Sequence, residues 1–139
     1  RDVLGSRGLG DVYKRQHDMG FKKCIITHPN ALIWKMSPAQ LERAASLGAW
    51  IEFCYLGRFW GEDSAMPTYP RQSLQEATEI LRVAPERTFI TTDLGQVGMP
   101  RPVAGMRQAR NELLKAGFSA ASLKSMLSDT PAYLIGLEK

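Results

Sequence analysis

Arg87-Thr88-Phe89-Ile90-Thr91-Thr92-Asp93-Leu94-Gly95-Gln96 is the stretch that decides how this chain folds. It is a short apolar and β-branched run that stops at a carboxylate and breaks into a glycine-containing loop. An acidic residue at the carboxyl end of a buried strand is where α/β proteins often place chemistry. A second run of the same design, Cys24-Ile25-Ile26-Thr27-His28-Pro29, ends at a histidine. We therefore expect His28 and Asp93 to belong to one site.

Strand and helix signals alternate along the chain on both sides of this stretch. The runs 22–27, 50–55 and 88–92 have the composition of buried strands. Ser37-Pro38-Ala39-Gln40 is a strong helix start, and Gly48 is placed to end that helix. Further helices are expected over about 72–83 and 103–116 and from residue 119, with a last turn from 130. This order predicts an α/β fold with a parallel sheet.

The predicted sheet looks like a piece of a larger structure, because three parallel strands leave at least one long apolar edge. Residues 1–16 fit nothing downstream and resemble translated adapter sequence from the ends of metagenomic reading frames. Their glycines do not form a phosphate loop, since they follow no strand, open no helix and have no lysine in the required register. We expect a non-native, poorly packed segment over 1–16 and one domain over 17–139.

Composition sets further limits on the class of protein. The 139 residues, 44% of them hydrophobic, suit one soluble domain, and no apolar run is long enough to span a membrane. Half of the net charge of +4 comes from residues 1–16, and the basic residues of the remaining chain are scattered, which argues against a nucleic-acid partner. Cys24 and Cys54 are expected to be buried small apolar residues and not a disulfide. A cytoplasmic protein is the resulting expectation.

Histidine and aspartate at strand ends suit a divalent metal such as zinc, because imidazole and carboxylate are usual ligands. An aspartate beside such an ion could also accept a proton from water. Simpler interpretations stay open. A lone strand-end histidine often makes only a hydrogen bond, and an aspartate before Leu94-Gly95 is often only a turn former.

Four other residues are candidates for contacts with substrate. Glu52 sits among apolar residues in mid-strand, and a buried carboxylate needs a partner, so it is either a site residue or half of a structural ion pair. Trp60 lies in a loop after a strand, where it could line a pocket or anchor the loop; Trp34 and Phe59 share this ambiguity. Arg58 and Arg101 lie in similar loops and are candidate substrate ligands.

Several of these segments, taken together, resemble the C-terminal part of an amidohydrolase-superfamily protein of the TatD-like and phosphotriesterase-like type. The resemblance covers about residues 20–138 and rests on residues 25–29, 48–52, 85–96 and 130–137. It implies a TIM (β/α)₈ barrel of which this chain holds about three βα units. It also implies that His28 is a metal ligand, that Asp93 is both ligand and proton acceptor, and that Thr130 is the N-cap of a closing helix.

The resemblance implies a hydrolase that uses metal-activated water on an ester, amide or phosphoester bond of a small-molecule substrate. The superfamily's first-strand His-x-His pair and its mid-barrel lysine or glutamate are absent from this sequence. We therefore expect this chain to be inactive alone and any homo-oligomer to belong to the full-length parent. The alternatives are a non-catalytic degenerate barrel and a receiver-like α/β module. The second would need an acidic pair and a last-strand lysine, and we find neither.

Overall fold

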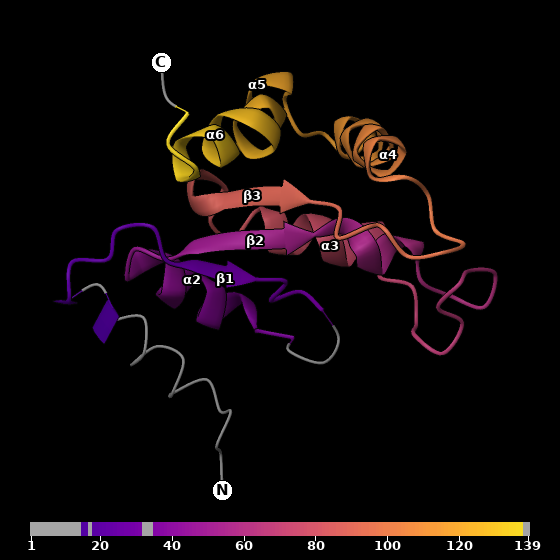
Figure 1. Ribbon diagram of the computed structural model, residues 1–139, viewed down its shortest axis with the longest axis horizontal. Helices are drawn as coiled ribbons and strands as arrows, with labels where there is room; N and C mark the ends of the chain where they lie inside the picture. The colour runs from indigo at the N-terminus through magenta and orange to yellow at the C-terminus, as the bar shows by residue number, and fades with distance from the viewer. Residues whose placement is uncertain (1–14, 17, 32–34, 138–139) are drawn as a thin grey trace, which may run out of the picture.

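A three-stranded, all-parallel open sheet lies at the centre of the computed structural model, which describes residues 15–16, 18–31 and 35–137 (Figure 1). β1 (Ile25–Thr27), β2 (Trp50–Cys54) and β3 (Thr88–Thr91) lie side by side in chain order. The predicted parallel α/β architecture is therefore confirmed, with strands slightly shorter than expected. The predicted non-native segment lies outside the described residues, apart from Arg15 and Gln16.

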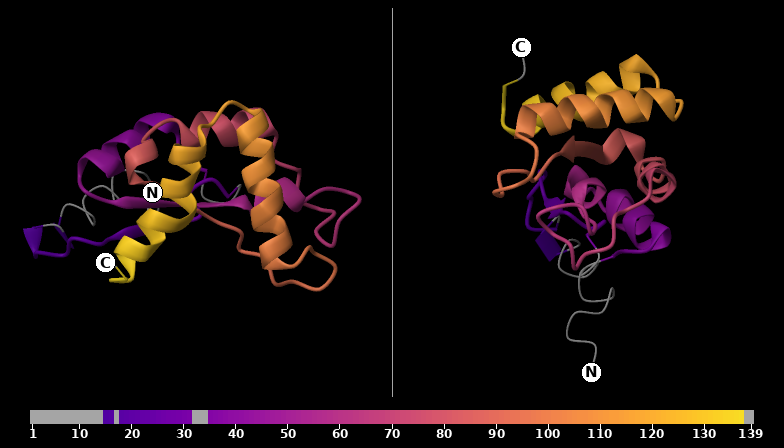
Figure 2. Two further views of the ribbon diagram at one scale, coloured as in Figure 1. Left: turned by 90° about the horizontal axis from the view of Figure 1, so that it is seen from above. Right: turned by 90° about the vertical axis from the view of Figure 1, so that its right-hand side faces the viewer.

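Two helices connect the strands and cover one face of the sheet (Figures 1 and 2). α2 (Pro38–Ser46) begins with the predicted capping box, in which Ser37 and Gln40 bond to each other's backbone N–H. Gly48 follows it with a φ of 89°, as a helix-ending glycine should. α3 (Leu74–Leu81) begins with a second, unpredicted capping box, formed by Ser73 and Glu76.

The core lies between this sheet face and the helices. Ile26, Ile51, Phe53 and Ile90 are buried there against α2 and α3. Each such side chain contributes about 1.5–3 kcal/mol by leaving water. The opposite sheet face is less covered: Thr27 is exposed. Parallel sheets usually have both faces covered, so the uneven cover is a feature that any functional interpretation must explain.

The remaining helices lie beyond β3, on the side away from β1 (Figure 1). α4 (Pro102–Lys115) is followed by α5 (Ala120–Lys124), a π-helical segment (Ser125–Asp129) and α6 (Thr130–Leu134). None of the helices in the described part of the chain is long and apolar enough to cross a membrane.

The last turn predicted at residue 130 is not separate, because helix runs on from α5 through the π segment into α6. The expectation that Thr130 caps this helix is wrong: it is buried and has helical φ and ψ of −64° and −47°. Pro131 has no N–H to give to the carbonyl four residues earlier. The wider π turn accommodates that missing hydrogen bond without ending the helix.

Candidate functional site

The two predicted metal ligands leave their strands in the same unusual conformation. His28 follows β1 with a φ of 39°, and Asp93 comes shortly after β3 with a φ of 52°. Among the described residues, these are the two non-glycine positions with positive φ. Histidine and aspartate tolerate this conformation better than most residues, but it is uncommon. Backbone strain of this kind collects at functional sites, so it marks both strand ends independently of the sequence pattern.

The register of the sheet shows that the alternation of side chains between its two faces does not by itself bring His28 and Asp93 together. Ile26, two positions before His28, pairs with Ile51 on the face covered by helices. Thr91, two positions before Asp93, pairs with Cys54 on the opposite face. Positive φ interrupts the alternation at each strand end. The directions of the two side chains therefore depend on these turns, which the pleat pattern could not predict.

His28 and Asp93 have the chemistry of metal ligands but do not form a metal site by themselves. His28 Nδ1 is buried without a hydrogen-bond partner, which is a rare state for a polar atom. Asp93 is exposed, and only its backbone carbonyl is bonded, to Gln96 Nε2 at 3.0 Å. No three His, Cys, Asp or Glu side chains within residues 15–16, 18–31 and 35–137 gather to hold an ion.

Glu52 belongs to a hydrogen-bonded chain on the less covered sheet face. Thr91 Oγ1 donates to Glu52 Oε1 at 3.0 Å, and Cys54 Sγ lies 3.3 Å from the same hydroxyl oxygen. Either the thiol or the hydroxyl can be the donor in this second contact. The structural ion pair considered for Glu52 is not seen among the described residues. Its role as a substrate contact stays a prediction.

The Cys54 thiol is held in its protonated form. Burial raises the pKa of Cys54 to about 11, and the nearby carboxylates of Glu52 and Asp93 act in the same direction. The hydrogen bonds with Thr91 and with the His28 backbone oppose this rise without cancelling it. Cys54 is therefore neither a thiolate nucleophile nor a free anion at neutral pH.

Arg58 is engaged within the fold. Its Nε and Nη2 donate to Glu112 Oε2 at 3.2 and 3.0 Å, and its Nη1 donates to the Gln72 carbonyl. Tyr55 donates to the same Glu112 oxygen at 2.7 Å. This cluster ties the 3₁₀ turn after β2 (Tyr55–Phe59) to α4. The contacts account for Arg58 structurally, and its predicted contact with substrate stays untested.

Trp60 and Arg101 differ in their surroundings. Trp60 is buried beside Tyr69, with ring centroids 5.0 Å apart, and its carbonyl accepts a 2.7 Å hydrogen bond from Arg71. Arg101 is exposed at the start of α4, where its side chain makes no capping hydrogen bond. Phe59 is buried as a loop anchor, and Trp34 lies outside the described residues.

Asn30, which is buried two positions after His28, was not predicted as a site residue. Its Nδ2 donates to the Cys54 carbonyl at 2.9 Å, and its Oδ1 accepts the Cys54 N–H at 3.1 Å. The amide thus replaces a peptide group and extends the β1–β2 ladder past the strand. An asparagine directly after a strand-ending His-Pro was the one available signal, and asparagine is common in turns for other reasons.

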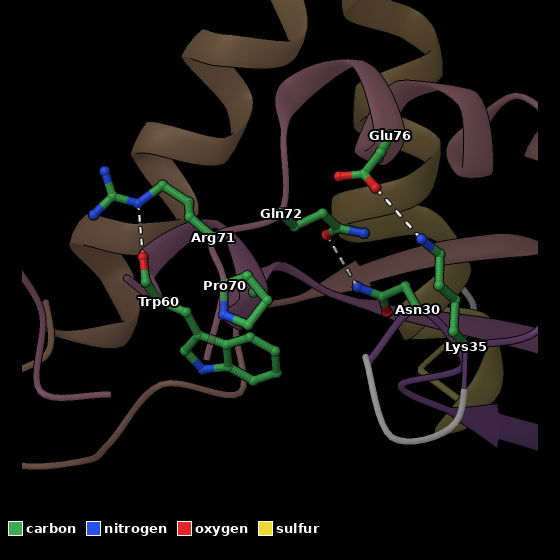
Figure 3. Close-up of a pocket in the computed structure, with 8 residues that line it drawn as sticks. Asn30, Lys35, Trp60, Pro70, Arg71, Gln72 and Glu76 are labelled. Carbon is green, nitrogen blue, oxygen red and sulfur yellow. Dashed lines mark hydrogen bonds and ion pairs between the residues drawn. The ribbon is translucent and has the colours of Figure 1, made fainter. Parts of the chain in front are cut away.

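A cavity of about 150 Å³ lies beside this amide, between the loop after β1, the turn after β2 and the start of α3 (Figure 3). Of the predicted site residues, Trp60 lines it, whereas His28, Glu52, Arg58, Asp93 and Arg101 do not. The metal-ligand candidates and the cavity are therefore separate features of the chain.

No protein-family model, curated protein or solved structure matches this chain. The resemblance to the amidohydrolase superfamily thus rests on the quoted segments alone.

Proposed function

We propose that this chain forms the last three βα units of a (β/α)₈ metal-dependent hydrolase of the amidohydrolase type. The observation that carries the proposal is the left-handed conformation of His28 and Asp93 at the ends of two parallel strands. The order of the strands and the position of the connecting helices also support the proposal. Strands in chain order with α2 and α3 on one face follow the barrel pattern, whereas doubly wound sheets carry helices on both faces.

In this proposal, His28 and Asp93 are ligands of a divalent metal, and zinc suits their imidazole and carboxylate donors. When bound, the metal supplies the Lewis acidity that activates water towards an ester, amide or phosphoester bond of a small substrate. Asp93 accepts the proton that the water loses. Glu52 lies on the face that would become the barrel interior, while Trp60 and Arg101 belong to segments that follow the carboxyl ends of β2 and β3.

Two donors are too few for a catalytic zinc site, which usually has three protein ligands. The proposal therefore requires further ligands, such as a first-strand His-x-His pair, from a polypeptide region that the described residues do not contain. It follows that the isolated chain should bind metal weakly and should not hydrolyse substrates. The uneven cover of the sheet has the same explanation, because the missing strands would close the barrel over the less covered face.

The test compares the isolated chain with the same chain joined to its native upstream sequence. The joined protein should retain zinc by elemental analysis and hydrolyse p-nitrophenyl acetate or bis(p-nitrophenyl) phosphate. Asp93→Asn should lower kcat about 10²–10⁴-fold, the usual effect of a general base. Asp129→Asn, which changes an exposed carboxylate paired with Lys124, is the matched control. Metal-dependent hydrolysis by the isolated chain would contradict the proposal.

One observation favours the second candidate, a non-catalytic α/β module. The helical segment that includes Ser125–Asp129 packs beside β3, where a first barrel strand would pair at about 4.8 Å. A closed barrel requires this segment to move. Amide hydrogen exchange on the joined protein separates the two candidates. Loss of its contact with β3 supports the barrel, and an unchanged contact without bound zinc supports the module.

A further inference from the structure

The cavity beside Asn30 has walls of distinct chemistry (Figure 3). Trp60 and Pro70 form an apolar side, and Lys35 and Glu76 form the rim on the opposite side. The side-chain amide of Gln72 lies between them. Pockets with an apolar wall and a few converging polar groups are typical binding sites for small molecules.

The hydrogen bonds fix which way the amides point. The Cys54 backbone N–H donates to Asn30 Oδ1, so Asn30 must direct its Nδ2 to acceptors. One acceptor is the Cys54 carbonyl and the other is Gln72 Oε1, at 3.4 Å. Gln72 must therefore present its Nε2 outward, towards Lys35 in Figure 3. The cavity thus has two hydrogen-bond donors, an amide NH₂ and an ammonium group, aimed at the same region.

We propose that this cavity binds a small monocarboxylate with a flat apolar body. The carboxylate accepts hydrogen bonds from Gln72 Nε2 and Lys35 Nζ, and the apolar body packs against Trp60 and Pro70. The cavity volume of about 150 Å³ is similar to that of protein cavities that hold a benzene ring. The open rim leaves room for the carboxylate next to Lys35. This assignment goes beyond the proposed hydrolase function and does not depend on it.

The charges at the rim favour a single negative charge on the ligand. Lys35 Nζ lies 3.4 Å from Glu76 Oε1, and both side chains are about half exposed. Hydrogen bonds from the backbone and hydroxyl of Ser73 lower the pKa of Glu76, so it stays ionised at neutral pH. A monocarboxylate can take the place of Glu76 at Lys35, whereas a dianion such as phosphate is repelled by Glu76 more strongly than a monoanion is. Arg71 also lines the cavity, but its guanidinium points away from it, bonds to the Trp60 carbonyl and pairs with Asp63.

Sodium benzoate is the probe for this proposal, and benzamide and inorganic phosphate are its controls. Titration of the ¹⁵N-labelled chain with benzoate should give saturable shifts at the Trp60 indole N–H, the Gln72 side-chain amide and the Gly57 backbone amide. A ligand this small should bind with a dissociation constant on the order of 1 mM. Benzamide, which has the same shape without the charge, should bind more weakly, and phosphate should cause no saturable shift at these groups.

Three variants test the role of the charges at the rim, and the two rim variants should change the affinity for benzoate in opposite directions. Lys35→Gln should weaken benzoate binding about three- to fivefold, as expected for an exposed ion pair. Glu76→Gln keeps a residue suited to the capping box and should strengthen binding, because it frees Lys35 and removes a repulsive charge. Lys22→Gln changes an exposed lysine outside the cavity and should have no effect.

The proposal is overturned by any of three results. The first is the absence of saturable shifts up to about 50 mM benzoate, a concentration well above the expected dissociation constant. The second is equal affinity for benzamide and benzoate. The third is an equal effect of Lys35→Gln and Lys22→Gln on benzoate binding. The titration involves neither a metal nor hydrolysis. A negative titration would therefore not contradict the proposed hydrolase function, and a lack of hydrolase activity would not contradict benzoate binding.

Discussion

The side-chain amide of Asn30 bonds to both backbone groups of Cys54, at 2.9 and 3.1 Å. Pro29 lies between Asn30 and His28 and has no N–H to offer a neighbouring strand. The Asn30 amide therefore continues the ladder where the backbone cannot. It fixes the loop after β1 to the carboxyl end of β2, close to the candidate ligand His28 and to the cavity.

Asn30→Ala should lower the free energy of unfolding by about 2–4 kcal/mol, because it leaves two buried backbone groups without partners. Asn30→Asp should also destabilise, since a carboxylate accepts the Cys54 N–H but cannot donate to the carbonyl. Urea denaturation measures both effects. Asn111→Ala, at an exposed position of α4, should stay within about 0.5 kcal/mol of the parent chain. A similar result for Asn30→Ala would exclude the role given to its amide.

Gly105→Ala should destabilise the chain although alanine is the better helix former by about 1 kcal/mol. A Cβ at residue 105 would meet Leu94 Cδ1 at 2.2 Å, so Leu94 must shift from its place on α4. Such overpacking usually lowers stability by about 1–3 kcal/mol. In a Leu94→Ala background the same change should be neutral or stabilising. Gly95→Ala, with open space around it, is the control.

Glu112 should make the stability of the chain depend on acid pH. Burial alone would raise its pKa, but hydrogen bonds from Gln108, Tyr55 and Arg58 outweigh this and lower it below 4.5. A lowered pKa in the folded state contributes stability above the unfolded-state value, which is lost as the pH falls through the folded-state value.

Glu112→Gln should therefore lower the free energy of unfolding by about 1–3 kcal/mol at pH 7. The difference from the parent chain should shrink as the pH falls below 4.5, the ordinary glutamate value. Urea denaturation at a series of pH values measures this. Glu86→Gln, at an exposed position, should show no such trend. A difference that is constant with pH would mean that Glu112 acts only through its shape.

Cys54 should react with thiol reagents far more slowly than Cys24 in the folded chain. Its pKa of about 11 leaves almost no thiolate at pH 8, and its side chain is buried, whereas Cys24 is partly exposed. Cys24→Ser and Cys54→Ser variants allow each thiol to be followed alone with a chromogenic disulfide reagent. In denaturant both thiols should react at similar rates. Fast labelling of Cys54 in the folded chain would contradict the structure around it.

The candidate site was only partly predictable. The sequence placed His28 and Asp93 at strand ends, because a β-branched run that stops at a polar residue is a local pattern. It did not place the two side chains relative to each other, since the sheet register and the positive φ values decide that. Arg58 was predicted to contact substrate, and its pairing with Glu112, 54 positions away, could not be read from the residues around it.

What the sequence determined by itself is the set of local structures. Ser37 with Gln40 starts a helix and Gly48 follows its end, because capping and left-handed turns depend on residues within one helical turn. The alternation of strands and helices also determined the parallel sheet. Only the tertiary structure decided the Asn30 clamp, the hydrogen-bonded chain from Cys54 to Glu52 and the cavity beside Trp60. Their groups come from segments far apart in the chain, and packing of the whole core brings them together.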